Sequence, residues 1–204
     1  PVLVLTDDDN AANRFAADLR GFSERDVVQL PSRELVMADV VGVSRGYEQR
    51  RLAALDELTE AHFAVASVQA AAQRTMPPEA LKAAIVSLAT GETAPLDELA
   101  QSLTRAGYER CVQVEGTGQF SIRGGILDVF PPQAEHPYRV EFWDDEIDSI
   151  STFDVGSQRR LEQCECLRCL PCMESIPALA KGGAAGLAKA VLALTSTRRK
   201  KQHA

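Results

Sequence analysis

The spacing of apolar residues changes part-way along the chain, and this change limits the folds that the chain can adopt. Before residue 76, apolar segments at 2–6, 27–30 and 63–68 predict strands, and 47–58 predicts a helix. Strands separated by helices indicate a parallel sheet covered by helices. After Met76-Pro77-Pro78, strand-like segments follow closely, with glycines and prolines between them. We therefore expect an α/β protein that contains a parallel sheet and an antiparallel meander.

The segment boundaries predict three parts: residues 1–80, 81–157 and 158–204. The last part holds one strand-like segment at 161–170 and an Ala- and Leu-rich helix pattern at 176–194. The strands expected in the meander are 111–114, 119–122, 126–130, 138–143 and 147–153. The chain begins with Pro1 and runs directly into a strand, so we expect it to be a fragment of a longer protein.

The two helices expected in the first part have recognisable signals. The acidic run at 7–10 predicts an N-terminal cap, followed by apolar residues at helical spacing that include Phe15 and Phe22. Gly21 is expected to end this helix. In the helix at 47–58, leucines share one side, and Arg51 is expected on the solvated side.

Composition and charge exclude several classes of protein. The chain carries 22 basic and 29 acidic residues, a net charge of −7, which argues against nonspecific binding to DNA phosphates. No apolar run is long enough for a membrane span, and we expect no membrane partner. Five cysteines without a signal peptide indicate a reducing compartment, so we predict a cytoplasmic location.

Four of the cysteines, Cys164, Cys166, Cys169 and Cys172, lie close together in the sequence. They could supply four thiolates to zinc, but two well-separated Cys-x-x-Cys pairs are missing. Small residues packed in the core are the favoured interpretation. We expect neither a metal nor a cofactor.

No motif for nucleotide chemistry is present. The phosphate-binding loop G-x-x-x-x-G-K-[ST] does not occur. Gly116-Thr117-Gly118 lacks the third glycine and the following helix of a dinucleotide loop, so a hairpin turn is favoured. Asp144-Asp145-Glu146 lies between two strands, where acids are typical of a solvated turn.

Two stretches carry a specific family resemblance. Arg-Gly-Gly-Ile-Leu-Asp occupies 123–128, and Phe-Trp-Asp-Asp-Glu-Ile-Asp-Ser occupies 142–149. With Leu-Pro-Ser-Arg-Glu at 30–34, they give the chain a close resemblance to the bacterial transcription-repair coupling factor family. The match is to the N-terminal module of that family and spans roughly residues 2–175. The Cys-rich segment and the Ala- and Gly-rich end depart from the family pattern.

The alternative is a fragment of the related helicase UvrB, which binds nucleotide and damaged DNA. UvrB carries a phosphate-binding loop and a tyrosine-rich hairpin. Here the region between Leu30 and Phe63 has one tyrosine, Tyr47. The segment 124–128 also matches the coupling-factor form, which we therefore favour.

The resemblance implies a degenerate, helicase-like parallel α/β part, an inserted α+β domain with an antiparallel sheet, and a return segment. It implies that the inserted domain binds the excision-repair protein UvrA at sites of stalled RNA polymerase, in transcription-coupled nucleotide excision repair. The complete family members are ATP-driven DNA translocases. RNA polymerase and DNA are contacted through parts that this chain lacks, so the segment itself is expected to be non-catalytic.

Strand periodicity points to candidate binding residues. Side chains alternate between the faces of a strand, and in 138–143 Val140 and Phe142 belong to an apolar face. The opposite face carries Arg139, Glu141 and Trp143.

If the strand at 119–123 shares this sheet, Arg123 joins the same open face. Arginine beside an aromatic residue and an acid is typical of protein-binding hot spots. The alternative interpretation is that these residues form ordinary surface salt bridges, worth about 0–1 kcal/mol per pair. Periodicity alone favours neither interpretation.

The resemblance favours the binding interpretation. Positions that match Arg123, Arg139 and Trp143 lie in the family's UvrA-binding surface, and Glu141 matches an acid of the related UvrB surface. We expect Arg139 to be the dominant anchor, because its guanidinium can form a bidentate pair with a partner carboxylate. On this view Arg139→Ala costs at least about 2 kcal/mol of binding, while the melting temperature stays nearly unchanged.

Overall fold

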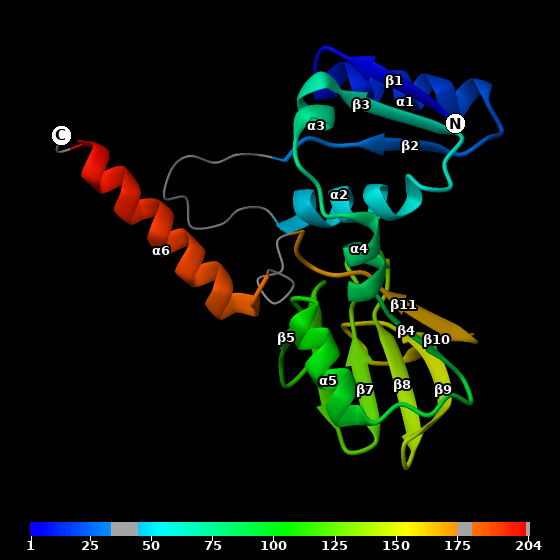
Figure 1. Cartoon of the computed structure of the whole chain (residues 1–204). Helices are drawn as coiled ribbons and strands as arrows, with labels where there is room; N and C mark the ends of the chain where they lie inside the picture. Colours follow the sequence, from blue (N-terminus) through cyan, green and yellow to red (C-terminus); the bar gives the residue numbers. More distant parts are fainter. Residues whose placement is uncertain (34–44, 175–180, 203–204) are drawn as a thin grey trace. The chain divides into compact units, whose positions relative to one another are not determined.

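The computed structural model describes residues 1–33, 45–174 and 181–202 (Figure 1). The chain divides into two compact units, residues 1–174 and 175–204. The second unit contains α6 (Gly183–Gln202), so the helix predicted at 176–194 begins later, and residues 175–180 lie outside the described residues. Within the described part of the chain, no helix combines the length and apolar character needed to cross a membrane.

The first 70 residues form the predicted parallel sheet with its covering helices. The strands pair in the order β1-β3-β2, and both pairings are parallel. The elements are β1 (Val2–Thr6), α1 (Asp9–Phe22), β2 (Val27–Leu30), α2 (Arg45–Glu57), β3 (Phe63–Ser67) and α3 (Val68–Ala72). The parallel and antiparallel sheets confirm the mixed α/β class, and the helicase-like character of this part stays a prediction.

Helix α1 begins as predicted but packs through different residues. Asp8 is the N-cap, and its carboxylate accepts a hydrogen bond from the backbone N–H of Ala11 at 2.7 Å. The buried residues are Ala12 and Ala16, whereas Phe15 and Phe22 are exposed. Small side chains let the helix lie close to the sheet, so the expected phenylalanine face is wrong. The helix also continues through Gly21 to Phe22 and is capped at Ser23.

The second sheet has six strands in the order β10-β9-β8-β7-β6-β5 (Figure 1). All neighbours are antiparallel except β5 and β6, which are parallel, so the turn expected at residues 116–118 does not form a hairpin. The strands are β5 (Glu109–Arg110), β6 (Gln119–Arg123), β7 (Ile126–Val129), β8 (Tyr138–Trp143), β9 (Glu146–Phe153) and β10 (Arg160–Cys164). The strand expected at 111–114 is therefore wrong.

A two-stranded ladder accompanies this sheet. It pairs β4 (Val86–Ala89) with β11 (Cys166–Cys169), antiparallel. The single strand predicted at 161–170 is thus two strands, because a bend at Glu165 separates β10, which pairs with β9, from β11. The division expected at residues 80 and 157 stays a prediction.

The main hydrophobic core covers one face of the six-stranded sheet. Helix α5 (Leu96–Arg105) contributes Leu99 and Leu103, and the ladder contributes Leu88 and Leu167. From the sheet itself, Phe120, Leu127, Val129, Val140, Ile147 and Ile150 pack into this core. The preceding helix α4 (Pro78–Ala84) connects it to the parallel part of the chain. The opposite face of the sheet is left for other contacts, and we call it the open face.

A buried ion cluster joins α2 to the end of the first unit. Arg51 and Glu174 have side chains only 1% exposed, and Arg51 Nε lies 3.1 Å from Glu174 Oε2. Arg33 Nη2 approaches the same oxygen at 2.6 Å, and Glu48 Oε1 accepts a hydrogen bond from the backbone N–H of Glu174 at 2.7 Å. The expectation that Arg51 is solvated is therefore wrong, because its partner lies more than 100 residues away in the sequence.

We predict that Glu174→Ala lowers the free energy of unfolding by about 3–5 kcal/mol, because Arg51 would remain buried without its carboxylate. Urea denaturation of the full chain measures this loss. The control is Arg168→Ala, which removes the more exposed ion pair between Arg168 and Asp56 and should cost about 0–1 kcal/mol. Equal losses in the two variants would contradict the prediction.

Candidate protein-binding face of the antiparallel sheet

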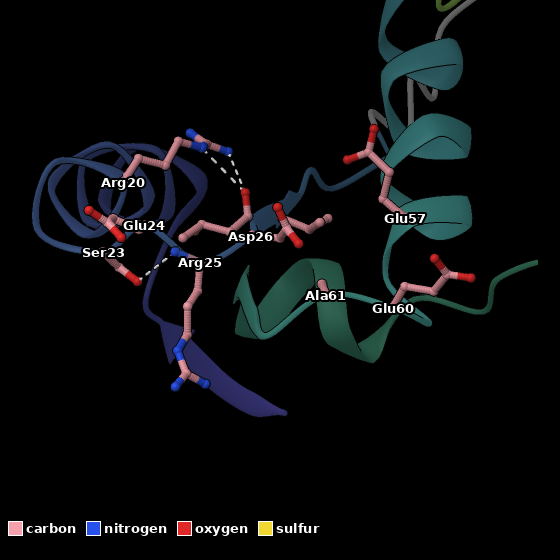
Figure 2. Close-up of a pocket in the computed structure, with 10 residues that line it drawn as sticks. Arg20, Ser23, Glu24, Arg25, Asp26, Glu57, Glu60 and Ala61 are labelled. Atoms are coloured by element: carbon pink, nitrogen blue, oxygen red, sulfur yellow. Dashed lines mark hydrogen bonds between the residues drawn. The ribbon is translucent and has the colours of Figure 1, made fainter.

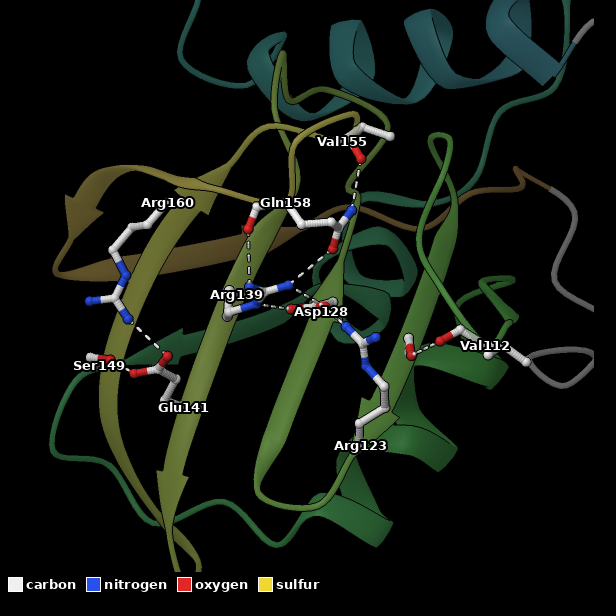
Figure 3. A network of polar contacts seen from close by, with 10 residues as sticks. Val112, Arg123, Asp128, Arg139, Glu141, Ser149, Val155, Gln158 and Arg160 are labelled. Atoms are coloured by element: carbon white, nitrogen blue, oxygen red, sulfur yellow. Dashed lines mark hydrogen bonds and ion pairs between the residues drawn. The ribbon is translucent and has the colours of Figure 1, made fainter.

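The open face carries a row of polar side chains that runs directly across four strands. Ser121, Asp128, Arg139 and Ser151 are cross-strand neighbours on β6, β7, β8 and β9. Their strand neighbours point into the main core, so alternation along each strand brings these polar groups onto one surface. Figure 3 shows the polar contacts around Asp128 and Arg139 on this face.

Asp128 and Arg139 form the centre of the network. Arg139 donates from Nε to Asp128 Oδ1 at 2.7 Å and from Nη2 to Oδ2 at 2.8 Å, a bidentate pair. The Asp128 side chain is only 2% exposed and that of Arg139 is 18% exposed. The hydrogen bonds to Asp128 raise the pKa of Arg139, so the guanidinium stays charged in this largely buried position.

Two further contacts fix the Arg139 guanidinium. Its central carbon lies 4.5 Å from the ring centroid of Phe153, a cation–π contact. Gln158 covers its edge, with Oε1 at 3.3 Å from Nη2, and in turn donates from Nε2 to the carbonyl of Val155 at 2.8 Å. The predicted anchor is therefore already bonded within its own chain.

Arg123 shares the Asp128 carboxylate from the other side. Its Nη2 lies 2.8 Å from Asp128 Oδ2, and half of its side chain, 50%, remains exposed (Figure 3). The single contact holds the guanidinium in place while most of the group stays accessible. Of the two predicted arginines, Arg123 is the one that a partner can reach directly.

Glu141 and Trp143 continue the open face along β8. Glu141 accepts a hydrogen bond from Ser149 at 2.9 Å and pairs with Arg160 at 2.8 Å. The Arg160 guanidinium holds the pKa of Glu141 below its ordinary value, so the carboxylate stays ionised. Trp143 ends the strand opposite Glu146 and is 81% exposed, an unusual degree for a large aromatic side chain.

Sequence reasoning placed all four candidates on one sheet face but missed Asp128, Gln158 and Arg160. Asp128 could have been found, because it alternates with the core residues Leu127 and Val129 on the strand between the two arginine strands. Gln158 and Arg160 follow β9, and only the return of the chain as β10 brings them to this face.

The parallel part of the chain has an open hollow of about 480 Å³, shown in Figure 2. Its rim carries acids such as Glu24, Asp26, Glu57 and Glu60. Arg20 is engaged with the backbone carbonyl of Val27 at 3.0 Å. Among the described residues, no group of three histidine, cysteine or acidic side chains is arranged to hold a metal ion. The hollow is open to solvent and lined by both acidic and basic side chains, so it offers little specificity for a ligand.

The carboxyl ends of the parallel strands meet at Asp9, the first residue of α1. Its carboxylate accepts hydrogen bonds from the backbone N–H of Ser32 at 2.9 Å and from the Ser32 hydroxyl at 2.6 Å. The Ser67 hydroxyl, at the end of β3, donates to the same carboxylate. Asp9 therefore links the start of α1 to the ends of β2 and β3.

The clustered cysteines lie in different environments. Cys166 is exposed, while Cys169 and Cys172 are buried in the main core near Tyr108. Burial raises the pKa of Cys169 to about 12, which opposes the thiolate form that metals and alkylating reagents require. The core interpretation of the cluster therefore agrees with Cys169 and Cys172, and with Cys164, which packs against the core, but it is wrong for the exposed Cys166.

We predict that Arg139→Ala lowers the free energy of unfolding by about 3 kcal/mol, because the buried Asp128 would lose its bidentate partner. This differs from the expectation of an unchanged melting temperature, which assumed a solvated Arg139. Arg123→Ala is the matched control and should cost about 0–1 kcal/mol, since Arg123 is half exposed. Chemical denaturation measures both variants, and an unchanged Arg139→Ala protein would show that Asp128 tolerates its loss.

We predict that Cys166 is alkylated in the native protein while Cys169 reacts only after unfolding. Cys166 is accessible to the reagent, whereas Cys169 is buried and its burial opposes the reactive thiolate form. Mass spectrometry of iodoacetamide-treated protein measures the sites. Protein purified without chelator should also contain well under one zinc ion per chain, and a stoichiometric zinc content would contradict the assignment of Cys169 and Cys172 to the core.

Comparison with known proteins gives a consistent result. Residues 86–174, which include the whole open-face network, match the family model described as UvrB interaction domain. The transcription-repair-coupling factor of Bacillus subtilis is 36% identical over 180 residues, 86% of this chain and 15% of that protein. The Escherichia coli protein of the same name is 33% identical over 176 residues, 85% of this chain and 15% of that protein. That of Mycobacterium bovis is 37% identical over 175 residues, 81% of this chain and 14% of that protein.

The chain spans only 14–15% of the length of these relatives. The resemblance predicted from the sequence is confirmed: over most of its length this chain is similar to transcription-repair-coupling factors, and its residues 86–174 match the UvrB interaction domain family.

Proposed function

We propose that this chain is a protein-interaction module that binds UvrA through the open face of its antiparallel sheet. In the complete protein it would recruit UvrA to sites of stalled RNA polymerase during transcription-coupled nucleotide excision repair. The observation that carries the proposal is an exposed Trp143 on the same face as a half-exposed, positioned Arg123, within the segment that matches a UvrB interaction domain.

The geometry of this face supports binding because its main groups need little reordering. Asp128 and Gln158 hold the arginines in single orientations, so a partner does not have to fix flexible guanidinium groups. Trp143 offers a large apolar surface with few rotatable bonds, as hot-spot aromatics do. We assign Arg123 and Trp143 direct contact with UvrA, with Arg139 and Glu141 completing the surface.

We propose further that residues 1–80 and 158–204 frame the UvrA-binding part at residues 81–157, and that none of the three is catalytic. Contacts with RNA polymerase and DNA would belong to other parts of the complete protein, since this chain spans a small share of its relatives. The five cysteines without disulfides support a location in the reducing cytoplasm.

We predict that UvrA is captured by the wild-type chain and that Trp143→Ala weakens this binding by about 2 kcal/mol, because hot-spot aromatics contribute about this much. Calorimetric titration measures the affinity. Phe22→Ala removes an even more exposed aromatic residue, on α1, and serves as the matched control, with no expected effect on binding. Failure of UvrA to bind the wild-type chain would refute the proposed function.

The same titration can be followed at a single residue. Trp143 is the one tryptophan in the sequence, so fluorotryptophan labelling places one fluorine signal on the open face. Its fluorine NMR resonance should shift and broaden when UvrA is added. An unchanged resonance at saturating UvrA would mean that binding takes place elsewhere on the chain.

A further inference from the structure

Two arginines of the open face, one on β6 and one on the edge strand β10, are held in the same way. Arg123 of β6 contacts Asp128 of the neighbouring strand β7, and Arg160 of β10 reaches across β9 to Glu141 of β8 (Figure 3). Each contact is made by one Nη2 at 2.8 Å. The side chains are 50% and 48% exposed, so each guanidinium is both positioned and accessible.

Glu141 has no carboxylate oxygen left without a partner. Oε2 accepts from the Ser149 hydroxyl at 2.9 Å, and Oε1 pairs with Arg160 at 2.8 Å. The two contacts fix the Glu141 carboxylate in one orientation beside Arg160. It is well placed to orient the arginine beside it.

We propose that Arg160 is a partner-binding residue of the open face, equivalent to Arg123, and that Glu141 acts as the positioning residue for Arg160. This inference rests on the proposed function. In this proposal the residue that contacts UvrA directly is Arg160, which sequence periodicity did not identify, and not the predicted Glu141.

The charge of the two arginines specifies the chemistry of the partner surface. Arg123 approaches Asp128 from β6, and Arg160 approaches Glu141 from the opposite side, from β10. Carboxylates are the groups that bind accessible guanidinium groups most strongly. The complementary surface is therefore an acidic protein surface on UvrA.

The competing explanation is an ordinary surface ion pair that contributes about 0–1 kcal/mol of stability and no binding. The two explanations differ in what Arg160→Ala does. If Arg160 binds UvrA, the Arg160→Ala variant has a lower affinity for UvrA and the same melting temperature as wild type. If Arg160 forms only a surface ion pair, the affinity of the variant is unchanged.

The test is a calorimetric titration of UvrA with the full chain and its variants. We expect Arg160→Ala to weaken binding about tenfold and to reduce the salt dependence of the affinity. Arg160→Lys, which keeps the charge but loses the planar fork, should lie between Arg160→Ala and wild type. Arg105→Ala, on the helix that covers the opposite face, is the matched control and should bind like wild type.

A double-mutant cycle tests the role of Glu141. Glu141→Gln should weaken binding in the wild-type background and have no further effect in the Arg160→Ala background, because its action passes through Arg160. Equal UvrA affinity of wild type and Arg160→Ala would overturn this inference and leave the proposed function intact. Additive losses would overturn the positioning role, and absence of wild-type binding would overturn both proposals.

Discussion

A single buried carboxylate, Asp128, organises the open face of the antiparallel sheet. It lies in the middle of a strand, nearly inaccessible to water, and it is compensated by guanidinium groups from the strands on either side. A buried acid is tolerated only with such partners, because desolvating an unpaired charge is costly. Asp128 therefore requires Arg139 to remain engaged and holds Arg123 in place at the edge of the cluster.

The consequence is a division of labour between the two arginines. Arg139 is covered by Gln158 and stacked on Phe153, so its main contribution is to keep the face ordered. Arg123 remains half exposed and can meet a partner. A loss of binding in an Arg139 variant would combine disorder with a missing contact, whereas an Arg123 variant isolates the contact itself.

The hydrophobic core beneath the sheet gives this face its rigidity. Helix α5 and the β4–β11 ladder bury the opposite side of the same strands, so each polar residue of the open face alternates with a fully packed neighbour. The buried pair of Arg51 and Glu174 ties the end of this region to α2. Both features favour a preformed surface, which lowers the ordering cost of binding.

The local sequence pattern was sufficient to predict most of the helices and strands. Alternation in the segment Tyr138–Trp143 placed its apolar and polar faces correctly, and the acidic run at 7–10 predicted an N-cap, which the structure shows to be Asp8. These features depend on residues that are neighbours in the sequence, where periodicity and capping chemistry act directly. The resemblance to transcription-repair-coupling factors was likewise readable from short stretches of sequence.

The sequence by itself determined the two kinds of sheet and the face of β8 to which Arg139 and Glu141 belong. Only the tertiary structure decided which charges are engaged: Arg51 with Glu174, Arg139 with Asp128, and Arg160 with Glu141. Periodicity assigns a side chain to a face but does not say which group lies opposite, because partners are set by strand order and register. The same reason explains why residues 161–170 became two strands, since β10 and β11 pair with different neighbours.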